Sequence, residues 1–293
     1  MKRVKKPDWL KIRLGNNEQF SFTGKTITDH HLHTICQSGK CPNLGECWNK
    51  GTATFMIGGE ICTRSCKFCN TKTGRPLPLD PKEPHNIAES IAKMDLKHVV
   101  ITSVDRDDLP DFGATHWKQT IQAVKLRNPG ITMEVLIPDF QGNNSFLDFI
   151  IEARPDIISH NMETVRRLTP LIRHRTGYKT GMEVLKYLSK SGIPIKSGIM
   201  VGLGEKKEEV WELMDDLLTI NCRLLSIGQY LQPSKKNIPV LEYISPEMFN
   251  EYKQTAITKG FKHIESAPLV RSSYHSKNFL KNISDFTEQK ISF

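Results

Sequence analysis

Short apolar runs alternate with longer amphipathic stretches from about residue 53 to residue 265. Turn residues bound each run, and the stretches between the runs carry apolar residues at helical spacing, which is the pattern of repeated βα units on a parallel sheet. The pattern predicts strands at 54–57, 98–102, 132–137, 156–159, 194–200 and 224–229, and helices at 86–95, 114–127, 145–153, 181–190, 205–220 and 246–259.

Six βα units are too few to close an eight-stranded barrel, so the sequence predicts an α/β fold, a partial (βα)6 TIM-type barrel. Residues 1–52 are polar with little periodic hydrophobicity, and the tail after Ile264 is short and polar. We therefore expect an N-terminal extension (1–52), the barrel (53–265) and a C-terminal tail (266–293). Functional side chains of such arrays gather at the C-terminal ends of the strands, and we expect the motifs there.

Composition narrows the class of protein. The 293 residues are 38% hydrophobic and 25% charged, as in globular proteins. No stretch approaches the roughly 18 apolar residues of a membrane span, and the basic start lacks the pattern of a signal or transit peptide, so we expect a cytoplasmic enzyme and no membrane. The net charge of +9 indicates an acidic partner, but no stacking platform or DNA-binding spacing occurs, so we expect no nucleic acid.

The first of two cysteine triads directly follows the first predicted strand. Cys62, Cys66 and Cys69 have the spacing Cys-x3-Cys-x2-Cys. Thiolates suit iron–sulfur clusters or zinc, and a short loop can hold three of them at one face of a cubane. A structural zinc site normally has four protein ligands, and no fourth cysteine is obvious here. The triad therefore favours a cluster with one open iron, to which a substrate or cofactor can bind.

The second triad lies in the N-terminal extension, where Cys36, Cys41 and Cys47 have the spacing Cys-x4-Cys-x5-Cys. Zinc stays an alternative here, with a histidine of the segment 30–33 as fourth ligand. Disulfides are disfavoured in both triads by the cytoplasmic interpretation and by the odd number of cysteines. Cys222 stands alone, and we interpret it as a packed core thiol.

The cysteine spacing in its βα context is typical of the radical S-adenosylmethionine (SAM) superfamily, and the second triad narrows the resemblance to one family. The chain resembles the lipoyl synthase family over nearly its whole length. Matching segments run in the family's order from Lys6 to His275. They are KPDWLK, LHTICQSGKCPNLGECW, ATFMIGGEICTRSCKFC, TSVDRDDLPD, HNMETVRRL, KSGIMVGLGE, IGQYLQPS and LVRSSYH.

The resemblance implies a barrel of the radical SAM type and a sulfurtransferase with two 4Fe-4S clusters. SAM would bind the open iron of the Cys62, Cys66 and Cys69 cluster, and one electron would cleave it to methionine and a 5′-deoxyadenosyl radical. This radical would abstract hydrogen from C6 and C8 of a protein-bound octanoyl chain. An auxiliary cluster on the second triad would supply the two sulfur atoms. Unactivated C–H bonds resist acid–base chemistry, so a radical cofactor must carry such a reaction.

The resemblance also implies an oxygen ligand to the auxiliary cluster from the Arg-Ser-Ser-Tyr motif at 271–274. We assign this ligand to Ser273, with Ser272 as the close alternative. A cluster held by three thiolates and one weak oxygen ligand is easier to dismantle than one held by four thiolates, as a sulfur donor must be. Without the resemblance, a serine pair would indicate a turn or a helix cap.

Four residues near the predicted strands are candidates for SAM contacts. Asn161 and Glu163, after the fourth strand, suit the ribose hydroxyls, because a carboxylate accepts hydrogen bonds well. Lys196 on the fifth strand suits the SAM carboxylate, and Ser103 at the end of the second strand suits the amino group. Taken singly, each is more often a solvated polar residue.

Two other features are more ambiguous. Arg173 and Arg175 are candidates for substrate or SAM contacts, or equally for surface arginines. Residues 58–60 spell Gly-Gly-Glu, the superfamily's motif for the SAM amino group, but they precede the first triad, whereas that motif lies at the second strand. We therefore do not assign them to SAM.

The chain departs from the family pattern at three positions. Phe112 stands where the family has Gly, Asn237 where His is common, and Ser276 where Ala is common. We expect none of them to touch a cluster ligand, so they bear on the shape of the substrate entrance and not on the chemistry.

The implied partners are an octanoylated lipoyl carrier protein or domain, a ferredoxin- or flavodoxin-type reductant and an iron–sulfur cluster carrier. The basic charge would suit an acidic carrier. One alternative is a cysteine-rich zinc- or cluster-bearing interaction module without turnover. Another is a radical SAM enzyme of a different sulfur-inserting type, such as a biotin synthase-like enzyme, against which the second triad and the segment 271–274 argue.

Overall fold

The structure, a computed structural model, describes residues 5–11, 17–173 and 175–274 of the chain. Its centre is a sheet of eight strands in the order β1-β2-β5-β6-β7-β8-β9-β10. β1 runs antiparallel to β2, and all other neighbours are parallel. The strands are β1 His33–Thr34, β2 Thr54–Ile57, β5 His98–Ser103, β6 Thr132–Leu136, β7 Ile157–Ser159, β8 Ile195–Val201, β9 Leu224–Gln229 and β10 His263–Ser266, and a separate pair joins β3 Ile61–Cys62 to β4 Lys72–Thr73.

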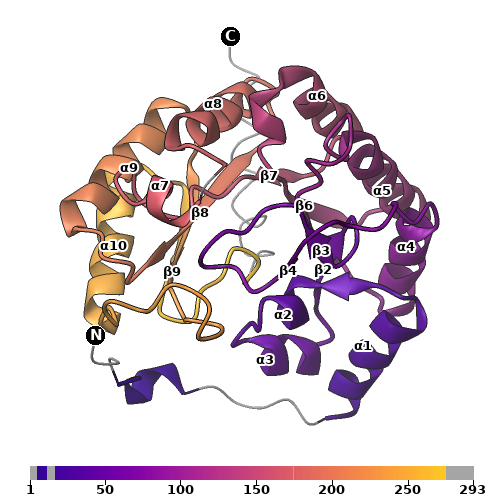
Figure 1. Ribbon diagram of the computed structural model, residues 1–293, viewed down its shortest axis with the longest axis horizontal. Coiled ribbons are helices and arrows are strands. Elements are labelled where there is room, and N and C mark those ends of the chain that lie inside the picture. The colour runs from indigo at the N-terminus through magenta and orange to yellow at the C-terminus, as the bar shows by residue number, and fades with distance from the viewer. Residues whose placement is uncertain (1–4, 12–16, 174, 275–293) are drawn as a thin grey trace.

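Helices form a ring around the outside of the curved sheet (Figure 1). In the described part of the chain the sheet ends at β1 and β10, which do not pair with each other, so the barrel is open. The longer helices are α1 Glu18–Asp29, α4 Glu83–Lys93, α5 Ala114–Arg127, α6 Asn144–Ala153, α8 Tyr178–Ser189, α9 Lys207–Thr219 and α10 Pro246–Lys259. The short ones are η1 Asp8–Leu10, α2 Ile35–Ser38, α3 Leu44–Asn49, η2 Phe140–Gly142 and α7 Thr169–Ile172.

The predicted partial barrel of six βα units is confirmed. Each predicted strand and helix is present, with ends that differ by a few residues at most. Apolar spacing is a good guide here because parallel strands are covered by helices and bury nearly every residue. The helices bury one face against them, as α5 does with Trp117, Ile121 and Val124.

Several elements outside the six units escape the sequence pattern, among them β10 and α1. β10 extends the parallel sheet beyond β9 and pairs Ile264 with Leu225, so the chain after Ile264 continues as a strand to Ser266. Only Ile264 of this strand is buried, and no alternation marks it. α1 is missed because its buried residues are Thr23, Thr26 and a single apolar one, Ile27.

After β10 the chain turns back across the inner side of the barrel as the C-terminal strap, residues 267–274, drawn in yellow inside the ring of helices (Figure 1). The Gln229 amide of β9 donates to the Pro268 carbonyl (3.2 Å). A glycine is required at position 228, because a Cβ there would lie 2.0 Å from the Val270 carbonyl oxygen. The strap therefore lies directly against β9.

The predicted parts of the chain meet in one sheet, since β1 from the first part pairs with β2. The division at residues 52 and 265 stays a prediction, and the structure describes the last part only as far as Tyr274. None of the helices in the described ranges has the length and apolar composition that crossing a bilayer requires.

Candidate functional site

The first cysteine triad follows the C-terminal end of β2, in β3 and the loop from β3 to β4. The Cys62 sulfur accepts hydrogen bonds from the backbone amides of Arg64 (3.4 Å) and Asp105 (3.3 Å). The Cys69 thiol interacts electrostatically with both Cys62 and Cys66. The three thiols thus form one group at the end of the barrel where we expect the chemistry.

Burial raises the pKa of Cys62 and of Cys66 to about 12. At Cys66 the Arg173 guanidinium opposes this shift, while the carboxylates of Asp105 and Glu163 add to it. Thiols with such pKa values stay protonated at neutral pH unless a cation replaces the proton. The donor set therefore fits a metal cluster, whose iron would supply the positive charge.

A buried arginine anchors this loop to the barrel. Arg64, with a side chain 4% exposed, forms ion pairs with Asp107 (2.7 Å) and Asp139 (2.8 Å) and donates to the Thr176 hydroxyl (2.8 Å). Burial alone would raise the pKa of Asp139, but the hydrogen bonds and charge of Arg64 outweigh it and hold that pKa well below its usual range. The loop is thus tied to the segments that follow β5 and β6.

The second triad is carried by α2, α3 and the turn between them. Cys36 lies on α2, whose first turn is capped by the Thr34 hydroxyl, and Cys47 lies on α3. Cys41 occupies the turn, and its amide donates to the Cys36 carbonyl (3.0 Å). The three thiols interact electrostatically, and burial raises the pKa of Cys36 to about 12 and that of Cys47 to about 11. This donor set fits a metal cluster for the same reason as the first.

The C-terminal strap brings the Arg-Ser-Ser-Tyr motif to the second triad. The Thr54 hydroxyl donates to the Ser273 hydroxyl (2.8 Å) and also hydrogen-bonds to the Cys36 thiol. The charge of Arg271 acts on Cys41. Ser273 and the triad, although far apart in the sequence, therefore meet at the start of β2.

The two serines of the motif have different neighbours. The Ser272 hydroxyl accepts a hydrogen bond from the Asn161 amide (2.6 Å), and the Ser272 carbonyl accepts one from the Lys196 ammonium (2.5 Å). Both donors are among the four candidates for SAM contacts. The strap therefore contacts two SAM candidates through Ser272, and Thr54 links its Ser273 to the second triad.

Asn161 and Glu163 lie close to the first triad. Their side chains hydrogen-bond to each other, burial raises the pKa of Glu163, and the Glu163 charge acts on Cys66. Arg173 donates to the Asn161 carbonyl (3.0 Å), and its buried Nε has no partner among the described residues. A buried donor left without a partner beside a candidate site fits an anionic group of a ligand.

The other two SAM candidates have different surroundings. Ser103 accepts a hydrogen bond from the Trp117 indole of α5 (3.3 Å), and the described ranges show no contact between Ser103 and the other candidates. Lys196 is 1% exposed and pairs with Glu134 (3.0 Å) inside the barrel. Arg175 is exposed and pairs with a carboxylate of the segment after β5. The structure thus brings together Asn161, Glu163 and Arg173, but not Ser103.

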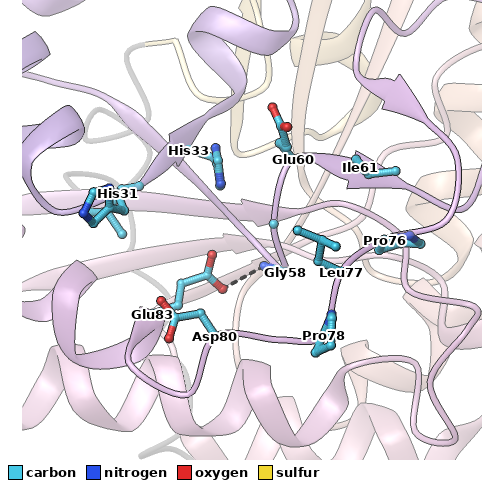
Figure 2. Close-up of a pocket in the computed structure, with 12 residues that line it drawn as sticks. His31, His33, Gly58, Glu60, Ile61, Pro76, Leu77, Pro78, Asp80 and Glu83 are labelled. Atoms are coloured by element: carbon cyan, nitrogen blue, oxygen red, sulfur yellow. Dashed lines mark hydrogen bonds between the residues drawn. The ribbon is translucent and has the colours of Figure 1, made fainter.

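The Gly-Gly-Glu stretch at 58–60 lines a pocket of about 310 Å³ that also includes residues of β1 and α4 (Figure 2). The Glu83 carboxylate accepts a hydrogen bond from the Gly58 backbone amide (2.9 Å), which is drawn as a dashed line in Figure 2. Glu60 pairs with Lys72 (2.7 Å). Gly58 and Glu60 thus already have partners within the protein, which supports leaving residues 58–60 out of the SAM site.

Two of the three family departures have visible consequences. Phe112 has a φ of 53°, in the left-handed region that glycine adopts without strain, and it packs against the Phe146 ring (5.7 Å between centroids). The Asn237 amide donates to the Cys69 carbonyl (2.7 Å), so the expectation that no departure touches a predicted cluster ligand is wrong. The third departure, Ser276, lies outside the described residues.

Sequence reasoning missed Thr54, Glu134 and Asp139. In the structure they contact Ser273, Lys196 and Arg64, respectively. A signal existed for Glu134, since a carboxylate within a buried strand needs a partner. Thr54 carries no such signal, because threonine is common in strands. The expectation that the motifs lie at the C-terminal strand ends is wrong for Lys196, the second residue of β8. It is also wrong for Ser273 and the second triad, which meet at the start of β2.

All seven cysteines are free thiols, and Cys222 is fully buried in the core, as expected. Across residues 5–11, 17–173 and 175–274, no three His, Cys, Asp or Glu side chains are placed to hold a single metal ion. A cubane does not require such convergence, because its thiolates bind different irons.

Known proteins similar to this chain are numerous. The sequence profile of the radical SAM superfamily matches residues 56–217. The lipoyl synthase of Parabacteroides distasonis is 64% identical over 277 residues, which cover 94% of this chain and 99% of that protein. The lipoyl synthase of Treponema denticola is 60% identical over 273 residues, which cover 93% of this chain and 94% of that protein.

Solved structures with a similar fold include Streptococcus suis SuiB bound to S-adenosylmethionine, with a TM-score of 0.58 and 13% identity over 84% of this chain and 60% of that one. Methylornithine synthase (PylB) has a TM-score of 0.52 and 11% identity over 80% of each chain. At these identities the similarity concerns the fold alone. The near full-length identity to two lipoyl synthases and the matched superfamily profile show that this chain belongs to the lipoyl synthase family of the radical SAM superfamily.

Proposed function

We propose that this chain is a radical SAM sulfurtransferase that inserts two sulfur atoms, at C6 and C8, into a protein-bound octanoyl chain to form the lipoyl cofactor. Its cofactors are two 4Fe-4S clusters and SAM. The observation that carries the proposal is the C-terminal strap, which lies inside the barrel with Ser273 beside the second triad and Ser272 beside Asn161.

We assign Cys62, Cys66 and Cys69 to the cluster that holds SAM. Three thiolates leave one iron open for SAM, and the amides that donate to the Cys62 sulfur favour its thiolate form. The bound cluster would supply the electron for SAM cleavage, which is chemistry that side chains cannot perform. Arg64 keeps the loop in place by its buried ion pairs.

The auxiliary cluster takes its oxygen ligand from Ser273 rather than from Ser272. The hydroxyl and carbonyl of Ser272 are both engaged by other residues, whereas the Ser273 hydroxyl shares Thr54 with the Cys36 thiol. A serine oxygen is a weaker partner for iron in a sulfur-rich site than a thiolate, as the donor role requires. The proposed ligands of this cluster are Cys36, Cys41, Cys47 and Ser273.

The proposed SAM contacts are Ser103, Asn161, Glu163 and Lys196, and their support differs. Asn161 and Glu163 have the strongest support, because they hydrogen-bond to each other near Cys66, where the Glu163 carboxylate suits the ribose hydroxyls. Arg173 adds a buried donor suited to the SAM carboxylate. Ser103 and Lys196 have weaker support, because each is engaged with another side chain.

The proposed substrate is an octanoylated lipoyl carrier protein or domain, and the net charge of +9 would favour an acidic one. Electrons would come from a ferredoxin- or flavodoxin-type reductant, and an iron–sulfur cluster carrier would rebuild the auxiliary cluster. We place the enzyme in the cytoplasm, where reducing conditions keep its cysteines available as thiols.

The test is mass spectrometry of an octanoyl-lysyl peptide after anaerobic incubation with reconstituted protein, SAM and a reductant. The expected product carries two added sulfurs. Cys41→Ala should release 5′-deoxyadenosine but insert no sulfur, whereas Cys66→Ala should not cleave SAM. Cys222→Ala, which removes a core thiol outside both triads, is the matched control and should give the wild-type product.

Two results would contradict the assignments. Normal lipoyl product from Cys41→Ala would exclude the second triad as the sulfur donor. SAM cleavage by Cys66→Ala after reconstitution would remove the first triad from its role.

A further inference from the structure

The barrel interior holds an ion pair that belongs to neither cysteine triad. Glu134 of β6 and Lys196 of β8 are 0% and 1% exposed, and the Lys196 ammonium lies 3.0 Å and 3.1 Å from the two carboxylate oxygens. The Ser159 hydroxyl donates to the same carboxylate (2.7 Å). Desolvation offsets much of the attraction in a pair buried this deeply, so its presence points to a role besides stability.

Lys196 has a third partner, the Ser272 carbonyl oxygen, 2.5 Å from the ammonium. That oxygen belongs to the same rigid peptide plane as the Cα atom of Ser273. A hydrogen bond to the Ser272 carbonyl oxygen therefore fixes the orientation of the peptide plane that carries the Cα atom of Ser273. The Asn161 amide holds the Ser272 hydroxyl as well (2.6 Å), so the residue before Ser273 is held at two points.

Among the described contacts, Glu134 reaches the strap through Lys196. A lysine ammonium has three protons to donate, and it lies within hydrogen-bonding distance of two oxygens from β6 and one from the strap. The carboxylate thus orients the ammonium toward the Ser272 carbonyl. Without Glu134, the Lys196 ammonium would lose the carboxylate that lies 3.0 Å and 3.1 Å from it.

We propose that the Glu134–Lys196 pair is a positioning device for Ser273, because it holds the Ser272–Ser273 peptide so that the Ser273 hydroxyl stays beside the second triad. The inference rests on the proposed function, since it takes Ser273 as the oxygen ligand of the auxiliary cluster. It gives Lys196 a partner other than the SAM carboxylate. In this role both residues act through the strap and are positioning residues for Ser273.

The test uses the full chain with the three cysteines of the first triad replaced by alanine, so that the cluster formed on reconstitution is the auxiliary one. In this background, Lys196→Met removes the ammonium and keeps a long side chain. The double variant Glu134→Gln/Lys196→Met removes both charges, which spares the fold an unpaired buried carboxylate. The matched control is Lys118→Met, which removes a partly exposed lysine paired with Glu152 (2.6 Å).

The readout is Mössbauer and EPR spectroscopy of the auxiliary cluster, with iron counted per chain. A 4Fe-4S cluster that loses its oxygen-ligated iron keeps three irons. We therefore expect loss of about one iron in four, as Fe²⁺, in Lys196→Met and in the double variant, as in Ser273→Ala. After one-electron oxidation by added ferricyanide, the three-iron cluster that remains should show its EPR signal. Lys118→Met should keep the spectrum of the background chain.

Circular dichroism and thermal unfolding establish that each variant is folded. If Ser273→Ala loses the iron while the folded double variant keeps it, the positioning role is overturned and the proposed function stands. If Ser273→Ala itself keeps the background spectrum, the ligand assignment fails and this inference fails with it.

Discussion

Replacing Gly228 with alanine is expected to push the C-terminal strap away from β9. The new Cβ would lie 2.0 Å from the Val270 carbonyl oxygen, whereas ordinary contacts begin at 3.4 Å, so the strap must retreat by the difference, about 1.4 Å. The two nearest atoms, the Val270 carbonyl oxygen and carbon, belong to the backbone, so no side-chain rotation relieves the overlap. The hydrogen bond from Thr54 to Ser273 is 2.8 Å long, and a retreat of this size would break it.

Stability and chemistry should respond to Gly228→Ala by different amounts. Overpacking of this kind costs about 1–3 kcal/mol of unfolding free energy. In a large domain 1 kcal/mol moves Tm by about 2–4 °C, so the variant should stay folded. Sulfur insertion should fall much further, by about 10²-fold, because that is the effect that a 1 Å misplacement can have on a rate. SAM cleavage should fall far less, because the first triad keeps its place and only the bonds from Asn161 and Lys196 to Ser272 are disturbed.

The assay measures 5′-deoxyadenosine and the sulfur content of an octanoyl-lysyl peptide in the same reaction, with thermal unfolding as the check on the fold. Gly177→Ala is the matched control, because the nearest atom to its new Cβ is Thr180 Oγ1, at 3.8 Å. Wild-type sulfur insertion by Gly228→Ala would refute the argument that the close approach of the strap to β9 places Ser273.

Asp139→Asn should destabilise the protein by about 3–5 kcal/mol in guanidinium unfolding, because Arg64 would lose a buried ion-pair partner. Because the pKa of Asp139 in the folded protein lies below its ordinary value of 3.8, its carboxylate stabilises the fold above pH 3.8, and this stabilisation is lost as the pH falls through the folded-state pKa. The destabilisation caused by Asp139→Asn should therefore be smaller in acid than at neutral pH. Equal destabilisation at both pH values would contradict this. Asn237→Ala should slow SAM cleavage by about 2- to 10-fold, the equivalent of one hydrogen bond, here the one to the Cys69 carbonyl. Asn237→His keeps a donor and should recover the rate, and a rate equal to that of the alanine variant would argue against the bond.

Local patterns in the sequence determined the βα array and the composition of both cysteine triads. Strands and helices of the array arise from apolar residues at spacings of a few positions, which are visible without the fold. Each triad lies within a short segment, at 62–69 and at 36–47, so its donor set can be recognised from spacing alone. Among the elements that escaped, α1 and β10 have buried residues that are mostly threonine or a single isoleucine.

Only the tertiary structure decided which serine faces the second triad and what surrounds Lys196. The contact of Thr54 with Ser273 joins residues 219 positions apart, and that of Lys196 with Ser272 joins residues 76 positions apart. The strap reaches Thr54 and Lys196 because the sheet curves and because Gly228 has no side chain to block its approach. No local sequence pattern encodes contacts between residues so far apart in the chain. The sequence by itself could therefore identify the donors of each cluster, whereas the arrangement of their supporting residues depends on packing between distant segments.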